Sequence, residues 1–206
     1  MMKRRRGRGD DGTALVEAAF VLPVIIVILF GIIEVGYLYR SASLATGSTR
    51  AGARIASAQY GAAYSNSASE RTVADSTAGA VAAELLSKGA TDTPSTLWIY
   101  KTDANGNTCA SSTSGTPCSA SSGIGSCAID CFKYTWAAAT KSFTYASGGW
   151  LSPDACGNTM DYVGIYVVMS HNPLVAPASL SVRTLTTKSV MRLEGRQGCT
   201  TPEGPA

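Results

Sequence analysis

Residues 18 to 33 of the chain read AAFVLPVIIVILFGII, and the architecture follows from this run. It contains no charged residue, and only Pro23 and Gly31 interrupt its apolar character. Its 16 residues fall short of the roughly 20 that a helix needs to cross about 30 Å of hydrocarbon. Apolar residues continue beyond Glu17 and Glu34, so we expect one transmembrane helix over about residues 14 to 38.

The charges around this span predict its orientation. Only Arg40 follows closely, whereas five basic residues precede the span: Lys3, Arg4, Arg5, Arg6 and Arg8. Because basic flanks stay in the cytoplasm, we expect the amino terminus inside and the chain beyond Tyr39 outside the inner membrane. A cleaved secretory signal is the alternative, but the apolar run exceeds the usual 7–15 residues and no A-x-A-like site closes it.

Composition limits the partners of the folded part. The 206 residues suffice for one ordinary domain, with 45% hydrophobic and 15% charged residues, against roughly 25% charged in soluble domains. Five of the 17 cations and two of the 14 anions precede Thr13, which leaves 12 of each beyond it. A nucleic-acid protein needs a basic surface, so we expect no nucleic-acid partner.

The residues after the span favour a continuation of the same helix. The segment SASLATGSTRAGARIASAQY (41–60) contains no proline. Helical spacing places four apolar residues on one side, namely Leu44, Ala51, Ile55 and Ala58. An adjoining arc carries Arg40, Arg50 and Arg54. We therefore expect one helix over residues 13–60, apolar all round at first and then amphipathic.

A second helix is predicted over residues 69–88. Ser67 and Glu70 have the spacing of a capping box, and Gly89 would end the helix. Four residues at fourfold spacing form its apolar stripe, namely Val73, Thr77, Val81 and Leu85. This stripe needs a partner, which either the first helix or a sheet could supply.

Short β-prone runs dominate from Pro94 onward. They are Leu97–Thr102, Phe132–Trp136, Lys141–Tyr145, Tyr162–Ser170 and Leu180–Leu193. Asn105-Gly106 is a hairpin-type dipeptide, and Asn107–Ser126 has the composition of a long loop. The sequence thus predicts an α+β fold in which residues 61–206 form an extracytoplasmic head, made of the packed second helix and a small antiparallel sheet with disulfides.

The cysteines favour disulfides. All six lie on the predicted outer side: Cys109, Cys118, Cys127, Cys131, Cys156 and Cys199. An even number in an oxidising compartment predicts at least two bridges, although 15 complete pairings are open. Zinc is the competing interpretation of Cys127-x-x-x-Cys131, but His171 is the only histidine and no Cys-x-x-Cys pair exists.

The sequence lacks the residue patterns that the common enzyme active sites require. His171 follows Ser170, but no G-x-S-x-G surrounds a serine, and we interpret this histidine as a surface or strand-end residue. The outer carboxylates Asp103, Asp130, Asp154 and Asp161 are scattered and indicate no glycosidase pair. No phosphate-binding loop occurs. We therefore expect neither an enzyme nor a cofactor.

Glu17 is the informative residue at the membrane boundary. An unpaired carboxylate inside the apolar run costs a few kcal/mol and usually indicates a partner. Cleavage after Gly12 would create an ammonium on Thr13 that could pair with Glu17 of the same or a neighbouring subunit. In the alternative interpretation, Glu17 is a juxtamembrane acid that reaches the headgroups.

The stretch RGDDGTALVEAAFVLP (8–23) resembles the amino end of TadE-like proteins, minor pilins of the bacterial tight-adherence (Tad) pilus. The similarity comprises the basic leader, a glycine with a glutamate five positions later and the Leu-Pro in the apolar run. GIIEVG (31–36) and TRAGAR (49–54) also resemble family motifs, and MRLE (191–194) is similar to its closing strand.

This resemblance implies a non-enzymatic minor pilin or pseudopilin that acts in pilus assembly. A prepilin peptidase would recognise Gly12, Thr13 and Glu17 and remove residues 1–12, and other Tad pilus subunits would be partners. The motifs make five residues candidates for helix packing: Glu17, Pro23, Glu34, Arg50 and Arg54. The alternative is a membrane-anchored extracellular binding protein unrelated to pili, with a ligand surface of Trp98, Trp136 and Trp150.

Overall fold

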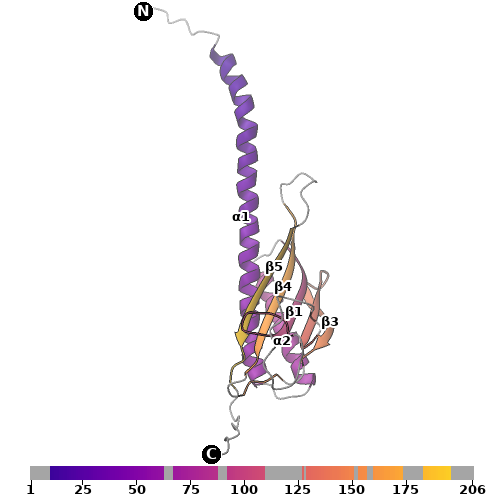
Figure 1. Ribbon diagram of the computed structural model, residues 1–206. Coiled ribbons are helices and arrows are strands. Elements are labelled where there is room, and N and C mark those ends of the chain that lie inside the picture. The colour runs from indigo at the N-terminus through magenta and orange to yellow at the C-terminus, as the bar shows by residue number, and fades with distance from the viewer. Residues whose placement is uncertain are drawn as a thin grey trace, which may run out of the picture. The chain divides into compact units, whose positions relative to one another are not determined.

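The computed structural model describes two helices and five strands, in the order α1, α2, β1 to β5 (Figure 1). The described residues are 10–62, 67–87, 92–109, 127, 129–150, 153–156, 160–173 and 183–195. The chain divides into two compact units, one of residues 1–40 and 173–180 and one of residues 41–172 and 181–206. The second unit contains the second half of α1, helix α2 and the five strands.

The predicted long helix is confirmed and is slightly longer than expected. Helix α1 spans Asp10–Ala62, with Pro23 inside it. It begins at Asp10, one turn before Thr13. Helix α2 spans Ser67–Ser87, which is close to the predicted 69–88.

The five strands form one antiparallel sheet in the order β3-β2-β1-β4-β5, which confirms the predicted fold class. The strands are β1 (Thr93–Thr102), β2 (Cys131–Ala137), β3 (Ser142–Gly149), β4 (Tyr162–His171) and β5 (Arg183–Arg192). Strand β1 begins four residues before the predicted start, because a register shift at Pro94/Thr96 accommodates the proline. Strand β3 was predicted to end at Tyr145 but continues to Gly149 beyond a second register shift.

One face of the sheet carries the main core. Leu97 and Ile99 of β1 point into it, as do four alternating residues of β4: Val163, Ile165, Val167 and Met169. All four residues of the predicted α2 stripe are buried. The period-2 and fourfold patterns in the sequence therefore identified the packed faces of β4 and α2.

In the second half of α1, the apolar stripe noted in the sequence is not the most buried face. Leu44, Ala51, Ile55 and Ala58 are only half-buried. The buried face instead consists mainly of small residues: Ser41, Ala45, Ser48, Thr49, Gly52, Ala53, Ala56, Ser57 and Tyr60. Small side chains let this part of the helix approach the sheet and α2 closely, and hydroxyls complete the contact. Thr49 Oγ1 lies 3.0 Å from Ser189 Oγ of β5.

The opposite face of the sheet is covered in part by the turn after β1. The Tyr100 ring lies against Gly164 of β4, where a Cβ would be 2.5 Å from the ring. The Tyr100 hydroxyl donates a hydrogen bond to the Gly106 carbonyl oxygen at 3.0 Å. Gly106 has φ +83°, so the expected Asn105-Gly106 turn uses glycine in the left-handed region. Beyond Cys109, most of the predicted long loop lies outside the described residues.

Candidate functional site at the amino-terminal helix

The predicted processing residues lie in the first turns of α1. Gly12, Thr13 and Glu17 are all exposed there. Thr13 and Glu17 are four residues apart, which places their side chains on the same face of the helix. A Cβ at Gly12 would meet no atom within 4 Å. The local structure therefore leaves the Gly12–Thr13 bond on an accessible helical surface.

The apolar half of α1 is uncovered in the described structure. Exposure reaches 76% for Phe20, 70% for Val27 and 68% for Ile32. An 18-residue window of α1 has a mean hydropathy of 2.8 with none of it buried, and α1 is the one described helix that is long and apolar enough to cross a membrane. Exposed apolar side chains over this length need lipid or protein around them. The helix is thus able to anchor the chain in a membrane.

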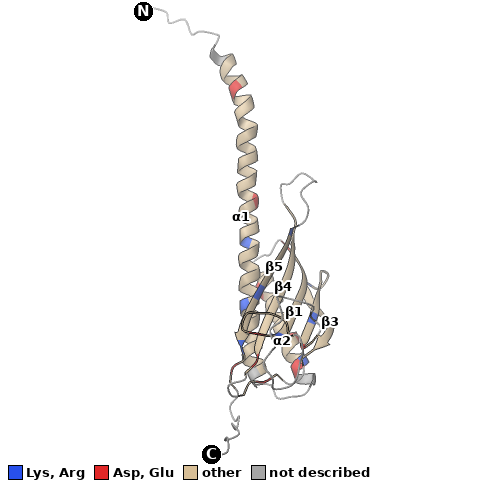
Figure 2. Ribbon diagram, in the orientation of Figure 1, with Lys and Arg blue, Asp and Glu red and all other residues tan. Residues whose placement is uncertain are grey.

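Charged positions are sparse along α1 (Figure 2). Between residues 14 and 39 the only charged residues are Glu17, which is exposed, and Glu34, which is half-buried. In the second half of the helix Arg50 and Arg54 are both exposed. The five residues expected to act in helix packing therefore all lie on α1, and the acidic and basic members occupy different parts of it.

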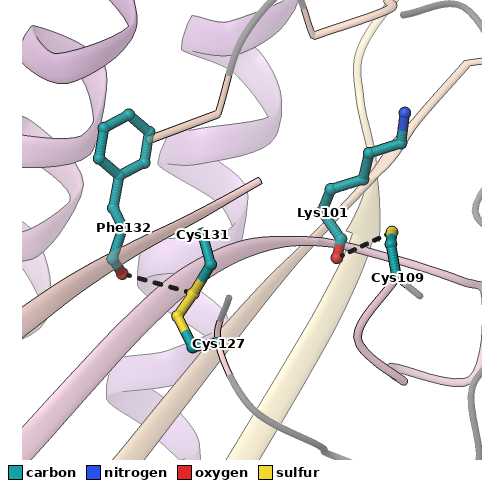
Figure 3. Close-up of a disulfide and its surroundings, with 5 residues drawn as sticks. All are labelled: Lys101, Cys109, Cys127, Cys131 and Phe132. Atoms are coloured by element: carbon teal, nitrogen blue, oxygen red, sulfur yellow. Dashed lines mark hydrogen bonds between the residues drawn. A yellow bond between two sulfur atoms is a disulfide. The ribbon is translucent and has the colours of Figure 1, made fainter. Parts of the chain in front are cut away.

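The head contains the predicted disulfide chemistry. Cys127 is bonded to Cys131, with the two Cα atoms 5.5 Å apart (Figure 3). The bond links Cys127 to Cys131, the first residue of β2. The pair therefore forms a disulfide, and the zinc interpretation does not apply to it. Cys109 and Cys156 are also disulfide-bonded, and the described residues include no free cysteine. Cys118 and Cys199 lie outside the described residues.

A buried ion pair that the sequence analysis missed joins the strands of the head. Lys101 Nζ lies 2.9 Å from Asp161 Oδ1, and the two side chains are 3% and 2% exposed. The other carboxylate oxygen, Asp161 Oδ2, accepts a hydrogen bond from the Asp154 N–H at 2.9 Å. Burial raises the pKa of Asp161, although Lys101 and the Asp154 N–H act to lower it. Lys101 follows Leu97 and Ile99 at the inward-facing positions of β1. This alternation was the feature of the sequence that could have predicted its burial.

His171 lies at a strand end, as expected, but the surface interpretation was wrong. It is 2% exposed, and its Nδ1 lies 2.8 Å from Oδ1 of Asp92, which is also buried. The inward alternation of β4 continues through Val167 and Met169 to His171, which explains the burial. The pair ties the residue before β1 to the end of β4.

The three tryptophans do not form a common surface. Trp150 is fully buried, with its ring centroid 5.0 Å from that of Tyr60. Trp98 packs with Tyr166 on one face of the sheet. Trp136 lies two residues after Tyr134 on β2, so the two side chains point to the same face of the sheet. Tyr134 pairs with Leu97 and both belong to the main core, so this face is opposite the one that carries Trp98. The ligand surface suggested for the binding-protein alternative is therefore absent from the described head.

Comparison with known families gives a match to the first part of the chain. Residues 12–54 match the family model described as TadE-like protein. The match confirms the resemblance to TadE-like proteins found in the sequence, over these residues of α1. Comparisons with curated proteins and with solved structures each gave no significant match. The matched segment begins at Gly12 and ends at Arg54, so it includes all the candidate processing and packing residues on α1.

Proposed function

We propose that this chain is a non-enzymatic minor pilin or pseudopilin that acts in the assembly of a Tad-type pilus. The observation that carries the proposal is the TadE-like match over an α1 helix whose apolar side chains are uncovered. Such a helix can lie in lipid before assembly and against other subunits after it. The head then serves as the exported, disulfide-bonded part of the subunit.

The proposed site of processing is the bond between Gly12 and Thr13. A prepilin peptidase would remove residues 1–12, with Thr13 and Glu17 beside the cut. Removal of the leader discards five basic residues and two acidic ones, a net charge of +3. Moving the helix out of the bilayer is easier without these charges, because charged groups are costly in hydrocarbon.

The new Thr13 ammonium supplies a partner for Glu17. An ion pair in hydrocarbon has little competition from water, so it would fix the axial position of one helix beside another. The proposed partners are therefore the prepilin peptidase, other Tad pilus subunits and the membrane. The proposed location is the inner membrane, with a cytoplasmic amino terminus, and processing would allow the chain to enter the pilus.

Two substitutions separate processing from assembly. Gly12→Ala should preserve membrane insertion but abolish or slow the loss of the leader. Glu17→Ala should still be cleaved but should be recovered with other pilus subunits in reduced amount. Intact mass and co-isolation with the pilus measure the two effects. Normal cleavage and co-isolation of both variants would contradict the proposal.

Orientation has its own test. A reporter that is active only outside the cytoplasm, fused after Ala206, should be active when the full chain is expressed. The same reporter placed before Met1 should be inactive. Activity at the amino terminus alone would reverse the proposed topology and leave the disulfides in a reducing compartment.

A further inference from the structure

The sheet face opposite the main core carries a row of four side chains that pair across the strands. Lys133 of β2 pairs with Trp98 of β1, and Trp98 pairs with Tyr166 of β4. Tyr166 pairs in turn with Lys188 of β5. Directly paired residues share a face of the sheet. Trp98 and Tyr166 do not belong to the main core, so the four residues lie on the opposite face, and we name them the outer row.

Two aromatic rings form the centre of the outer row. The ring centroids of Trp98 and Tyr166 are 5.1 Å apart, and the ring planes are inclined at 45°. Both side chains are half-buried, so part of each ring surface stays accessible. The C–H groups of a sugar ring carry partial positive charge and pack on the electron-rich face of an aromatic ring. The pair therefore offers a platform for a sugar ring.

The charges on this face favour an anionic ligand. The five described strands contain no aspartate or glutamate, whereas Lys133 and Lys188 flank the rings (Figure 2). Lys188 Nζ donates a hydrogen bond to the Asn105 carbonyl oxygen at 2.9 Å, which positions the ammonium without neutralising it. The Asp103 carboxylate in the same turn accepts hydrogen bonds from the N–H groups of Asn105 and Asn107. Cations without acids on the same surface attract anions.

Hydroxyl groups border the outer row. Thr96 pairs with Thr135, and Thr135 pairs with Thr144 of β3. Thr96 and Thr135 lie two residues from Trp98 and Lys133 on their strands, so these threonines share the face of the outer row. Thr135 and Thr144 are exposed. A hydroxyl both donates and accepts hydrogen bonds, which matches the hydroxyls of a sugar.

The spacing of the two lysines favours a polysaccharide over a nucleic acid. Lys133 and Lys188 lie three strand intervals apart, or about 14 Å at about 4.8 Å per interval. A polysaccharide with carboxylates on alternate sugars can place a neutral ring over the aromatic pair and a carboxylate near each lysine. A nucleic-acid strand carries a phosphate on every nucleotide, and the middle of the outer row offers no cation to these phosphates.

We propose that the outer row binds an acidic polysaccharide, with carboxylates on Lys133 and Lys188 and a sugar ring on Trp98 and Tyr166. This inference goes beyond the proposed function and does not depend on removal of the leader. It also differs from the tryptophan surface considered above, because Trp136 and Trp150 take no part. A subunit with this face attaches the structure that carries it to carboxylated polymers.

Binding to the purified full chain in detergent tests the proposal. The probes are oligosaccharides of hyaluronan and of alginate, which carry carboxylates, and neutral cellulose oligosaccharides of similar length. Both acidic probes should bind at low salt and weaken as salt is added, since exposed charges are screened beyond about 10 Å at 0.1 M. Binding of neither acidic probe, or equal binding of the neutral one, would overturn the proposal. So would tighter binding of single-stranded oligothymidylate.

Charge reversal locates the site. Lys133→Glu and Lys188→Glu should each weaken binding of the acidic probes about tenfold, which corresponds to about 1.4 kcal/mol. Lys141→Glu, an exposed charge reversal in the turn between β2 and β3, is the matched control and should bind normally. Thermal unfolding confirms that each variant is folded. Equal losses for all three variants would place the site elsewhere and contradict the proposal.

The aromatic platform has its own comparison. Trp98→Phe keeps a ring and should retain most of the binding, whereas Trp98→Leu keeps apolar bulk without a ring and should lose it. Equal binding by these two variants would contradict stacking on the ring.

The outcomes separate this inference from the proposed function. If the chain is cleaved after Gly12 and recovered with the pilus but binds neither acidic probe, the outer-row proposal is wrong and the proposed function stands. If the leader is retained and the chain is absent from the pilus, yet the outer row binds acidic probes, the proposed function fails and this inference stands.

Discussion

Gly52 of α1 lies so close to Val81 of α2 that a Cβ on residue 52 would be 2.5 Å from Val81 Cγ2. Ile165 of β4 completes the contact, with its Cγ2 at 3.6 Å from the same position. Gly52 therefore marks the point where both helices and the sheet meet. It also lies in the segment that matches the TadE-like family, so this segment includes part of the packing of the head as well as the membrane helix.

Replacement of Gly52 by alanine should destabilise the head by about 1–3 kcal/mol, because the added methyl group has no space. Gly79→Ala in α2 is the matched control, since a Cβ there meets no atom within 4 Å. It should be neutral or stabilise by up to about 1 kcal/mol through helix propensity. Thermal unfolding of the full chain in detergent compares the two. A stabilised Gly52→Ala variant would contradict the close packing.

Loss of the Lys101 ammonium should destabilise the head because it leaves a buried carboxyl group without its cation. Lys101→Met leaves the buried Asp161 carboxyl without its cation, and such a loss typically costs about 3–5 kcal/mol. Adding Asp161→Asn should recover part of this cost, because the neutral amide still accepts the Asp154 N–H bond. Denaturant unfolding of the single and double variants measures the difference. A double variant less stable than Lys101→Met would contradict this account of the pair.

The Asp103 turn should make stability depend on pH. Burial acts to raise the pKa of Asp103, but hydrogen bonds from Asn107 and Asn105 outweigh it and hold that pKa below its ordinary value. A lowered native pKa stabilises the fold above the ordinary aspartate range, and the contribution disappears as pH falls through the native pKa. Asp103→Asn should therefore be less stable than the wild type at neutral pH, and the gap should narrow in acid. A difference in the free energy of unfolding that widens in acid would contradict a lowered pKa for Asp103 in the folded chain.

Much of the fold could be predicted from regular patterns. The fourfold stripe of α2 and the alternation of β4 each point to one buried face, and both predictions are confirmed. The membrane-length helix was also evident from residues 18–33 together with the apolar residues on either side of them. These elements are predictable because burial of large apolar side chains dominates their packing.

The failures share a physical cause, which is packing by residues that a hydrophobic pattern does not mark. The second half of α1 buries Ala45, Gly52 and Ala53, because small side chains permit close approach of backbones, while Leu44 stays half-exposed. Lys101 and His171 are buried with acidic partners that are distant in sequence. Their inward positions in alternating strands were visible, but their partners were identifiable only in the folded chain.

The amino-terminal residue of the mature protein tests the central claim most directly. The full chain should be expressed in a cell that has its own prepilin peptidase, isolated from membranes and pilus fractions, and analysed by intact mass and terminal sequencing. Processing after Gly12 predicts a chain that begins at Thr13 and lacks the mass of residues 1–12. A mature chain that still begins at Met1 or Met2 would contradict the pilin account.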